Sequence, residues 1–422
     1  MPYFAMNGGF PLKGEITVQG SKNAVLPMMA AAVLHRGITV FTNVPEITDV
    51  SDMAEILEHL GCSVSRCGDV LLIDARVLEN CEIPREMGRK MRSSIMLLGA
   101  VLGRLGKAVA YHPGGCCIGA RPVDLHCRAL EQLGAEVDCE EDQITVRARR
   151  LTGGEIFLPF PSVGATENAI LAAVAASGET RIEGCAREPE IFQLCQFLVG
   201  MGARIVGIGS SSLRIAGGEP LHDVCYRVEG DRIAAATYLY GAAACRGEVT
   251  VEGICPEYLK LPLEMLEKTG CRIERWENAV KAVSRERLKA LPFVQTEVYP
   301  GFPTDLQPLW MSIMALADGT AGIRENIFEA RFQAAGELIK MGAEITVEGR
   351  RAWVTGKNQL AGQRVKAHDL RCGAALVLAG LAAKGQTRVD GIHYIKRGYE
   401  DLPGTLRELG ARITEEQAGD RN

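Results

Sequence analysis

The sequence predicts an α/β protein made of two similar domains, each containing three repeated units. Three observations lead to this prediction. Six segments share a helix–glycine–strand pattern, the first three recur at a nearly constant offset as the last three, and alanine-rich helical segments run through a glycine into further strands. At 422 residues, the chain is long enough for two domains of this kind.

The repeated segments each combine the last turn of an amphipathic helix, a glycine and a short strand. Glycine favours the left-handed conformation that commonly ends a helix, so each segment predicts a helix end followed at once by a strand. The six segments read LEHLGCSV, LEQLGAEV, LVGMGARI, LEKTGCRI, LIKMGAEI and LRELGARI.

The glycines of these segments fall into two sets of three. Corresponding members of the two sets lie 208 or 209 residues apart (for example 270 − 61 = 209). The pairs are Gly61 with Gly270, Gly134 with Gly342, and Gly202 with Gly410. A fixed offset of this size indicates a duplicated domain with three units in each copy.

Alanine-rich segments such as AAVAASGETRIEG and GAAACRGEVTVEG predict the other helix of each unit. Small side chains allow helices to pack closely, so these helices are expected inside each domain, with the sheets outside. The predicted fold is therefore two domains of three units each, six in total.

The second unit contains additional residues. Its two helix-ending glycines, Gly106 and Gly134, are 28 residues apart, whereas the corresponding distance in the other units is 23 to 25 residues. The added stretch contains HPGGCCIGARPVD, with Cys116 and Cys117 beside two glycines. Inserted glycine-rich loops are more often functional than structural, so a reactive thiol is predicted here.

Short polar turns precede several of the first helices, among them GSKN, KMRSS, SVGATEN, EGDR, FPTD and DLR. Helix N-termini attract anions, and Lys22, Arg92 and Arg371 would strengthen that attraction. Plain helix capping is the alternative for any single turn.

Further basic residues, Arg121, Arg331 and Arg397, lie in the second-helix regions. With Lys22 and Arg371, they predict a site for a small anion with several charges. Each basic residue considered alone is more often a surface residue, so this prediction depends on the whole set.

Asp305 follows FPT at the start of a helix. It is either a helix cap or, beside a cluster of cations, the general base for a hydroxyl group. Asp124 and Asp231 allow the same two interpretations.

Composition limits the function classes. The chain has 47% hydrophobic and 23% charged residues with a formal net charge of -5, which argues against a nucleic-acid partner. The apolar run 24–34 is too short to span a bilayer and no leader precedes it, so no membrane partner and a cytoplasmic location are expected.

The 14 cysteines include no Cys-x-x-Cys pair, so most are expected to be reduced core residues without zinc.

Eight motifs together resemble the enolpyruvyl transferases over essentially the whole chain, and among them the UDP-N-acetylglucosamine 1-carboxyvinyltransferases. The motifs are GSKNAVLP, MRSSI, PGGCCIGARPVDLH, SVGATEN, AREPEI, FPTDLQ, DLR and RGYE. The resemblance implies transfer of enolpyruvyl from phosphoenolpyruvate to the 3′-hydroxyl of UDP-N-acetylglucosamine, with release of phosphate. That reaction is the first committed step of peptidoglycan synthesis, and it implies no cofactor and no metal.

The same resemblance implies two inside-out α/β barrels with the active site in the cleft between them. The first barrel would span 22–229 and carry the Cys116 loop; the second would combine 1–21 with 230–422. The oligomeric state is left open.

Residue roles follow from the matched motifs. Cys116 corresponds to the thiol that acts as an acid toward C3 of phosphoenolpyruvate and can form an adduct at C2, whereas Cys117 occupies a variable position. Asp305 corresponds to the base, and Lys22 and Arg397 complete the catalytic set. The implied substrate contacts are Lys22, Asn23, Arg92, Arg121, Pro122, Val123, Asp124, Leu125, Ser162, Val163, Asp305, Ile327, Arg331, Arg371 and Arg397.

The chain departs from the family pattern at Phe160 and Pro161 before SVGAT, at Ala234 and at Ala330. These departures keep open a divergent paralogue that binds nucleotide sugar with weak or no catalysis, or a second copy of the enzyme. A further alternative is the shikimate-pathway enolpyruvyl transferase, which lacks the cysteine loop and reads GSKS rather than GSKN.

Overall fold

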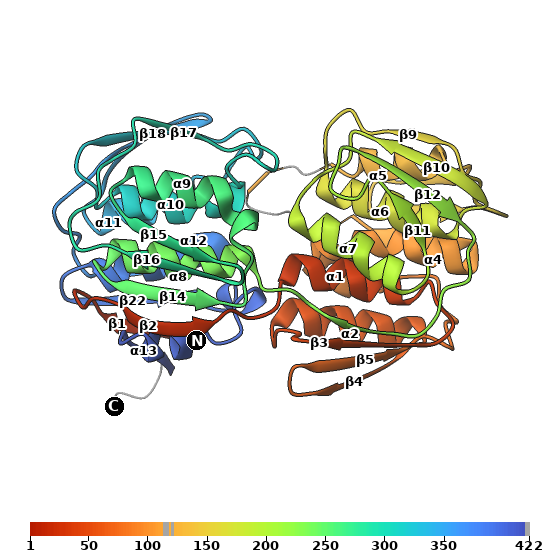
Figure 1. The fold of residues 1–422 in the computed structure, drawn as a ribbon, viewed down its shortest axis with the longest axis horizontal. Coiled ribbons are helices and arrows are strands. Elements are labelled where there is room, and N and C mark those ends of the chain that lie inside the picture. The colour runs from red at the N-terminus through yellow and green to blue at the C-terminus, as the bar shows by residue number, and fades with distance from the viewer. Residues whose placement is uncertain (113–117, 120–121, 418–422) are drawn as a thin grey trace. The chain divides into compact units, whose positions relative to one another are not determined.

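The computed structural model describes residues 1–112, 118–119 and 122–417 (Figure 1). These residues form two compact units. Unit 1 contains Met1–Gln19, 118–119 and 230–417, and unit 2 contains 20–112 and 122–229. The α/β class predicted from the sequence is confirmed by the helices and mixed sheets of both units.

Unit 1 contains three four-stranded sheets in the part of the chain that the structure describes. Their strand orders are β21-β22-β1-β23, β15-β16-β14-β2 and β17-β18-β20-β19. The strands of the first sheet are β21 (Arg364–Lys366), β22 (Gln386–Asp390), β1 (Pro2–Asn7) and β23 (Arg412–Gln417). Those of the second are β15 (Arg272–Trp276), β16 (Ala279–Val283), β14 (Glu248–Glu252) and β2 (Lys13–Thr17). Those of the third are β17 (Phe293–Gln295), β18 (Thr320–Arg324), β20 (Arg351–Thr355) and β19 (Glu344–Glu348).

Unit 2 contains the orders β13-β3-β5-β4, β11-β12-β10-β9 and β6-β8-β7 over its described residues. The first comprises β13 (Val224–Arg227), β3 (Ile38–Thr42), β5 (Val70–Asp74) and β4 (Ser63–Cys67). The second comprises β11 (Arg204–Val206), β12 (Ser212–Gly217), β10 (Gly178–Glu183) and β9 (Glu155–Phe157). The third comprises β6 (Lys107–Tyr111), β8 (Gln143–Arg147) and β7 (Glu136–Cys139).

The sheets of both units share one pairing pattern. In each four-stranded sheet, a parallel pair at one edge continues into two antiparallel pairs, as in β2–β14–β16–β15 and β9–β10–β12–β11. The three-stranded sheet keeps the antiparallel pairs and has an isolated parallel bridge from Glu82 to Val109. The N-terminal strands β1 and β2 complete sheets of unit 1.

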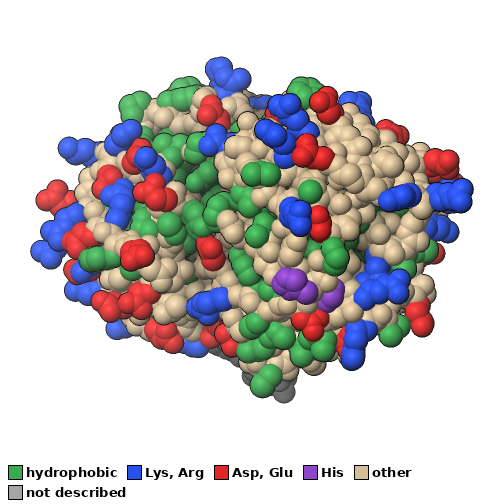
Figure 2. All heavy atoms as spheres, turned by 45° about the vertical axis from the view of Figure 1, so that its right-hand side comes forward, with side chains coloured by type: hydrophobic (Ala, Val, Ile, Leu, Met, Phe, Trp, Pro, Cys, Tyr) green, Lys and Arg blue, Asp and Glu red, His purple; other side chains and the backbone are tan. Residues whose placement is uncertain are grey.

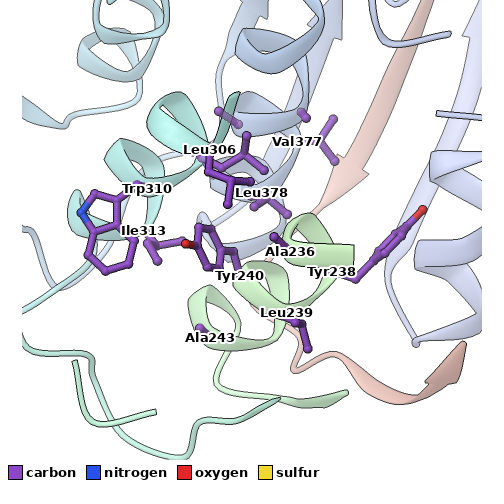
Figure 3. Close-up of a cluster of buried hydrophobic side chains, with 14 of the residues drawn as sticks. Ala236, Tyr238, Leu239, Tyr240, Ala243, Leu306, Trp310, Ile313, Val377 and Leu378 are labelled. Atoms are coloured by element: carbon purple, nitrogen blue, oxygen red, sulfur yellow. The ribbon is translucent and has the colours of Figure 1, made fainter. Parts of the chain in front are cut away.

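The helices of unit 1 form its core. Helices α8 (Arg232–Ala244), α10 (Gln307–Met314) and α12 (Leu370–Ala382) contact one another, and each contacts a different sheet. Figure 3 shows Tyr240, Trp310 and Leu378 within this core; the ring centroids of Tyr240 and Trp310 are 5.8 Å apart. The remaining helical segments are η2 (Pro256–Leu259), α9 (Lys260–Lys268), η3 (Thr304–Leu306), α11 (Gln333–Lys340), η4 (Ile395–Arg397) and α13 (Leu402–Glu408).

Unit 2 has a comparable core. Helix α4 (Leu97–Leu105) contacts α1 (Lys22–Ala32) and α6 (Val163–Ala175), and most residues of α1 and α6 are buried, as their alanine content predicts. The other helical segments are α2 (Thr48–Leu60), α3 (Arg85–Lys90), η1 (Arg92–Met96), α5 (Asp124–Glu131) and α7 (Pro189–Gly200).

Most of the described cysteines are buried. The twelve described cysteines are free thiols, and seven of them are buried. Burial raises the pKa of several of these thiols, for example that of Cys195 to about 12. The seven buried cysteines therefore pack as small apolar residues.

Candidate active site

Asp305, in the η3 turn that precedes α10, pairs with two arginines of unit 1. Its Oδ1 accepts a hydrogen bond from Nη2 of Arg331 at 2.9 Å, and its Oδ2 accepts one from Nη2 of Arg371 at 2.9 Å. The side chain of Asp305 is 27% exposed, whereas those of Arg331 and Arg371 are 3% and 5% exposed. Asp305 is therefore an ion-pair partner of two arginines rather than the helix cap allowed by the sequence.

The two arginines determine the charge state of Asp305. Burial by itself would raise the pKa of this carboxyl group, but the guanidinium groups of Arg371 and Arg331 outweigh burial and hold the pKa well below its ordinary value. Arg232, at the start of α8, lowers it further. Asp305 is consequently ionised at neutral pH, in a setting where the local positive charge exceeds the negative.

Backbone contacts help to position the two arginines. Arg371 lies in the first turn of α12, where Oδ1 of Asp369 accepts hydrogen bonds from the backbone N–H groups of Arg371 and Cys372. Nε of Arg331 donates to the carbonyl oxygen of Thr304 at 3.3 Å. The guanidinium group of Arg331 is therefore held against the η3 turn, and the capped start of α12 fixes the backbone that carries Arg371.

Two further predicted residues of unit 1 have defined positions. The backbone N–H of Ile327 donates to Oε1 of Glu325 at 2.8 Å. Arg397 ends the η4 turn and is half-buried. Asp231, whose role the sequence left open, is a helix cap, because its Oδ1 accepts hydrogen bonds from the backbone of Ile233 and Ala234 in α8.

In unit 2, Lys22 and Asp49 form a buried ion pair. The Nζ of Lys22, at the first position of α1, lies 2.7 Å from Oδ2 of Asp49 on α2, and the two side chains are 11% and 2% exposed. Asn23 follows Lys22 in the first turn of α1 and is half-buried.

The start of α6 carries Ser162 and Val163. The hydroxyl oxygen of Ser162 caps the helix by accepting from the N–H of Ala165 at 3.4 Å. The N–H groups of such a first turn suit an anionic group, as the sequence predicted for this motif.

Arg92 and the segment 122–126 meet close to α5 in the same unit. Nη2 of Arg92 donates to the carbonyl oxygen of Pro122 at 3.4 Å. Two residues into α5, Nδ1 of His126 lies 2.7 Å from the amide nitrogen of Asn168 on α6. Because Asn168 also bonds the backbone of Ile95 and Gly99, it links α6 to η1 and α4.

The fold is similar to those of solved enolpyruvyl transferases. The enolpyruvyl transferase NikO from Streptomyces tendae superposes with a TM-score of 0.89 at 25% identity, covering 99% of both chains. EPSP synthase from Acinetobacter baumannii has a TM-score of 0.76 at 19% identity, covering 99% of this chain and 100% of that one, which shows a shared fold. Residues 6–406 match the family model described as EPSP synthase (3-phosphoshikimate 1-carboxyvinyltransferase).

Curated relatives are more similar still. UDP-N-acetylglucosamine 1-carboxyvinyltransferase 2 of Caldanaerobacter subterraneus subsp. tengcongensis is 47% identical, covering 98% of this chain and 99% of its own. The enzyme of the same name, numbered 1, from Symbiobacterium thermophilum is 48% identical, covering 97% and 94%. The chain belongs to this family. The family prediction made from eight motifs is therefore confirmed.

The structure brings some of the residues matched to this carboxyvinyltransferase family into direct contact. Asp305, Arg331 and Arg371 form one group, as expected from the cluster of cations around a carboxylate. Arg92 contacts Pro122 in unit 2. Cys116, Cys117 and Arg121 lie outside the described residues.

The departures from the family pattern lie in three different settings. Phe160 is 46% exposed, and its carbonyl oxygen accepts from the N–H of Ser162 at 2.7 Å, so the turn before α6 is formed. Ala234 is buried in the first turn of α8. The exposed Ala330 donates its backbone N–H to the carbonyl oxygen of Ile118 at 3.0 Å, a contact that needs no particular side chain.

Several residues that help to hold the predicted site residues in place were not predicted from the sequence. Asp49, His126 with Asn168, and Glu325 are the main examples. His126 and Asn168 fall within the quoted motifs, and this could have drawn attention to them, whereas nothing in the sequence connects Asp49 to Lys22.

The described residues contain no group of three or more His, Cys, Asp or Glu side chains arranged to hold a metal ion. Within them, no helix is both long and apolar enough to cross a membrane. Figure 2 shows Lys and Arg side chains interspersed with Asp and Glu over the visible face.

Proposed function

We propose that this protein transfers the enolpyruvyl group of phosphoenolpyruvate to the 3′-hydroxyl of UDP-N-acetylglucosamine and releases phosphate. The carboxyvinyltransferase name of relatives up to 48% identical supports the reaction. The observation that carries the proposal is the pairing of Asp305 with Arg331 and Arg371, because it combines a proton acceptor with cations suited to a phosphate or carboxylate.

Asp305 acts as the base in this proposal. Its oxygen takes the proton of the sugar hydroxyl while that hydroxyl oxygen forms a bond to C2 of phosphoenolpyruvate. C3 accepts a proton from the Cys116 thiol, which gives a tetrahedral intermediate. The Cys116 thiolate then takes a proton from C3, and cleavage of the bond from C2 to the phosphate oxygen regenerates a carbon–carbon double bond and releases phosphate.

The arginines make Asp305 a weak base before substrate arrives. An anionic substrate that accepts hydrogen bonds from Arg331 or Arg371 would draw those guanidinium groups partly away from Asp305, and its negative charge would further favour protonation of the carboxylate. The pKa of Asp305 would then rise toward the range in which a carboxylate accepts a proton effectively. Substrate binding would therefore activate the base.

The remaining matched residues divide by substrate in this proposal. Lys22, Arg121 and Arg397 bind the phosphate and carboxylate of phosphoenolpyruvate, with Arg331 and Arg371 assisting, and Asn23 forms a hydrogen bond to the ligand in the same pocket. The contacts with UDP-N-acetylglucosamine are Arg92, the residues from Arg121 to Leu125, Ser162, Val163, Asp305 and Ile327. The ion pair of Lys22 with Asp49 and the capped start of α6 support these assignments.

The fold proposed with this function is two inside-out barrels of three units each. Residues 22–229 make the first barrel, and 1–21 with 230–422 make the second. The pairing pattern common to the sheets and the mutual contacts of α8, α10 and α12 support this arrangement. The cytoplasm is the proposed location.

The deciding experiment incubates the protein with both substrates and identifies the products by mass. A nucleotide sugar heavier by one enolpyruvyl group, formed together with one equivalent of phosphate, is the expected result. A divergent paralogue that only binds nucleotide sugar would release no phosphate in a single turnover. An enolpyruvyl product from shikimate 3-phosphate, with none from the nucleotide sugar, would contradict the proposed acceptor.

A further inference from the structure

Glu325 occupies an unusual position for a carboxylate. It follows the end of β18 and is fully buried, at 0% exposure. A charged side chain removed from water in this way requires hydrogen bonds to compensate for its lost hydration. Glu325 has four of them, and they come from three separate parts of unit 1.

Oε1 of Glu325 accepts three of these hydrogen bonds. One comes from the hydroxyl of Thr296 at 2.8 Å, and two come from the backbone N–H groups of Ile327 and Phe328 at 2.8 and 3.0 Å. The carboxylate therefore organises the turn that contains Ile327. The hydroxyl oxygen of Thr296 also accepts from the N–H of Asn326 at 2.9 Å, which closes the turn from the other side.

Oε2 of Glu325 connects this turn to Asp305. It accepts from the hydroxyl of Thr304 at 3.0 Å, and Thr304 immediately precedes Asp305. The carbonyl oxygen of Thr304 in turn accepts from Nε of Arg331. One buried carboxylate thus joins the turn at Ile327 to the backbone that carries Asp305.

We propose that Glu325 is a positioning residue that holds Asp305 and Ile327 in register for the acceptor sugar. It touches neither substrate in this proposal, which rests on the proposed function. Because the four hydrogen bonds converge on one carboxylate, removing it releases both segments at once. Loss of position at the base lowers kcat, and loss of position at Ile327 raises the KM for nucleotide sugar.

The experiment compares Glu325→Ala with Glu325→Gln in the full-length protein. Gln keeps a carbonyl oxygen for Thr296, Ile327 and Phe328, and its amide group can donate to the hydroxyl oxygen of Thr304. We expect Ala to lower kcat at least 10-fold and raise the KM for nucleotide sugar several-fold, whereas Gln stays within 3-fold of the parent. Glu344→Gln, at an exposed pair with Lys357 in the same unit, is the matched control.

Unchanged kcat and KM in a folded Glu325→Ala protein would overturn the proposal, and so would equal losses in the Gln and Ala variants. If the Ala variant does not fold, Thr304→Val removes only the connection to Asp305. It should lower kcat without changing amide exchange at Ile327, and a parental kcat would contradict the proposal. A parent protein without enolpyruvyl transfer would refute the proposed function instead. In that case the positioning can still be tested, because amide exchange at Ile327 and Phe328 should be faster in Glu325→Ala than in the parent.

A second, independent observation concerns a pair of thiols in unit 2. Sγ of Cys127 on α5 lies 3.3 Å from Sγ of Cys139 at the end of β7. Cys139 is exposed, whereas Cys127 is buried at 7% exposure. An oxidant in solution therefore reaches Cys139 first, and a second sulfur is already in contact with it.

We infer that Cys127 and Cys139 form an intramolecular disulfide when the protein meets a peroxide. The Cys139 sulfur attacks one peroxide oxygen, the O–O bond breaks, and water and a sulfenic acid result. The Cys127 sulfur, losing its proton, then attacks the Cys139 sulfur and displaces a second water. Two thiols and one hydrogen peroxide thus give one disulfide and two waters.

Mass spectrometry of the full-length protein tests this inference. After brief treatment with hydrogen peroxide and alkylation of the remaining thiols, we expect a cross-linked peptide pair lighter by two hydrogens, which a thiol reductant reverses. Cys139→Ser should abolish that pair, whereas Cys225→Ser, at an exposed cysteine on β13, should not. Sulfinic or sulfonic acid at Cys139 without a link to Cys127, or a link to another cysteine, would overturn the inference.

Discussion

Lys22 on α1 and Asp49 on α2 form an ion pair of 2.7 Å whose members are almost completely buried. A buried pair of this kind is sensitive to the loss of one partner, because the other charge remains in a poorly hydrated place. The pair therefore holds Lys22, a proposed phosphate ligand, in one orientation at the start of its helix.

The Lys22–Asp49 pair predicts that substitutions of these two residues have non-additive effects on the free energy of unfolding. Lys22→Met should lower the free energy of unfolding by about 3 kcal/mol because it removes the cation that Asp49 pairs with. Adding Asp49→Asn to that variant should recover part of the loss. Urea denaturation of the parent, the two single variants and the double variant measures the coupling. Additive losses would show that the pair contributes no energy of its own.

Replacing Asp305 is expected to lower kcat far more than it weakens binding of the nucleotide sugar. Asp305→Asn keeps the shape of the side chain but removes the proton acceptor, so we expect kcat to fall about 100-fold or more, in line with the loss of a general base. The Kd for nucleotide sugar, measured by calorimetry, should change less than 10-fold. Asp318→Asn, at an exposed aspartate in the same unit, should leave both values unchanged. A parental kcat in Asp305→Asn would refute the role of base.

The arginines beside Asp305 predict a difference between two pH profiles. In the free protein they hold the pKa of Asp305 well below its ordinary value, so its carboxylate stays ionised as the pH falls to about 4. A bound anionic substrate draws the guanidinium groups away and raises this pKa. The acid limb of kcat, which reports the complex, should therefore lie at higher pH than the acid limb of kcat/KM. Identical acid limbs would contradict activation of the base by substrate.

The sequence predicted the fold from features that are local and repeated. Gly61 and Gly270 both take the left-handed conformation expected at a helix end, with φ of 111° and 98°. Gly247 is required for a different reason, because the positive φ belongs to the preceding residue, Arg246. A Cβ on Gly247 would lie 2.0 Å from the carbonyl oxygen of Leu12. The sequence pattern shows where such a glycine lies. The reason that a glycine is needed there depends on the atoms packed against it.

The candidate site was predictable where a motif carries its own chemistry. Asp305 and Arg371 were named from their motifs and Arg331 from its place among the basic residues, and the structure places them in contact. The partners that hold site residues were not predictable, because tertiary packing brings them together. Glu325 lies 20 residues from Asp305 (325 − 305), and its function depends on hydrogen bonds to three segments.

His126 predicts a specific loss of stability in acid. Burial, followed by the nearby charge of Arg92, lowers the pKa of His126 to about 3, so the folded protein keeps this ring neutral. The unfolded chain binds a proton at His126 below pH of about 6.5. The stability contributed by the neutral ring is therefore complete above pH 6.5 and declines toward pH 3, by up to about 1.4 kcal/mol per pH unit.

Denaturation at pH 7 and pH 5 measures this effect. The parent should lose more stability between these two pH values than His126→Gln, which has no titrating group at this position. His222→Gln, at an exposed histidine in the same unit, serves as the control and should behave like the parent. Equal losses in the parent and in His126→Gln would show that the acid sensitivity arises elsewhere.

Cys116 predicts selective alkylation by fosfomycin, a small epoxide phosphonate. The phosphonate is an anion suited to the cations matched to phosphoenolpyruvate binding, and the thiolate of Cys116 opens the epoxide ring to form a carbon–sulfur bond. We expect one adduct per chain, located at Cys116 by peptide mass spectrometry, with activity lost in proportion to its formation. Cys116→Ser should form none, whereas Cys117→Ser should react like the parent. Reaction at Cys117 in place of Cys116, or full activity in a completely modified protein, would contradict the role assigned to the Cys116 thiol.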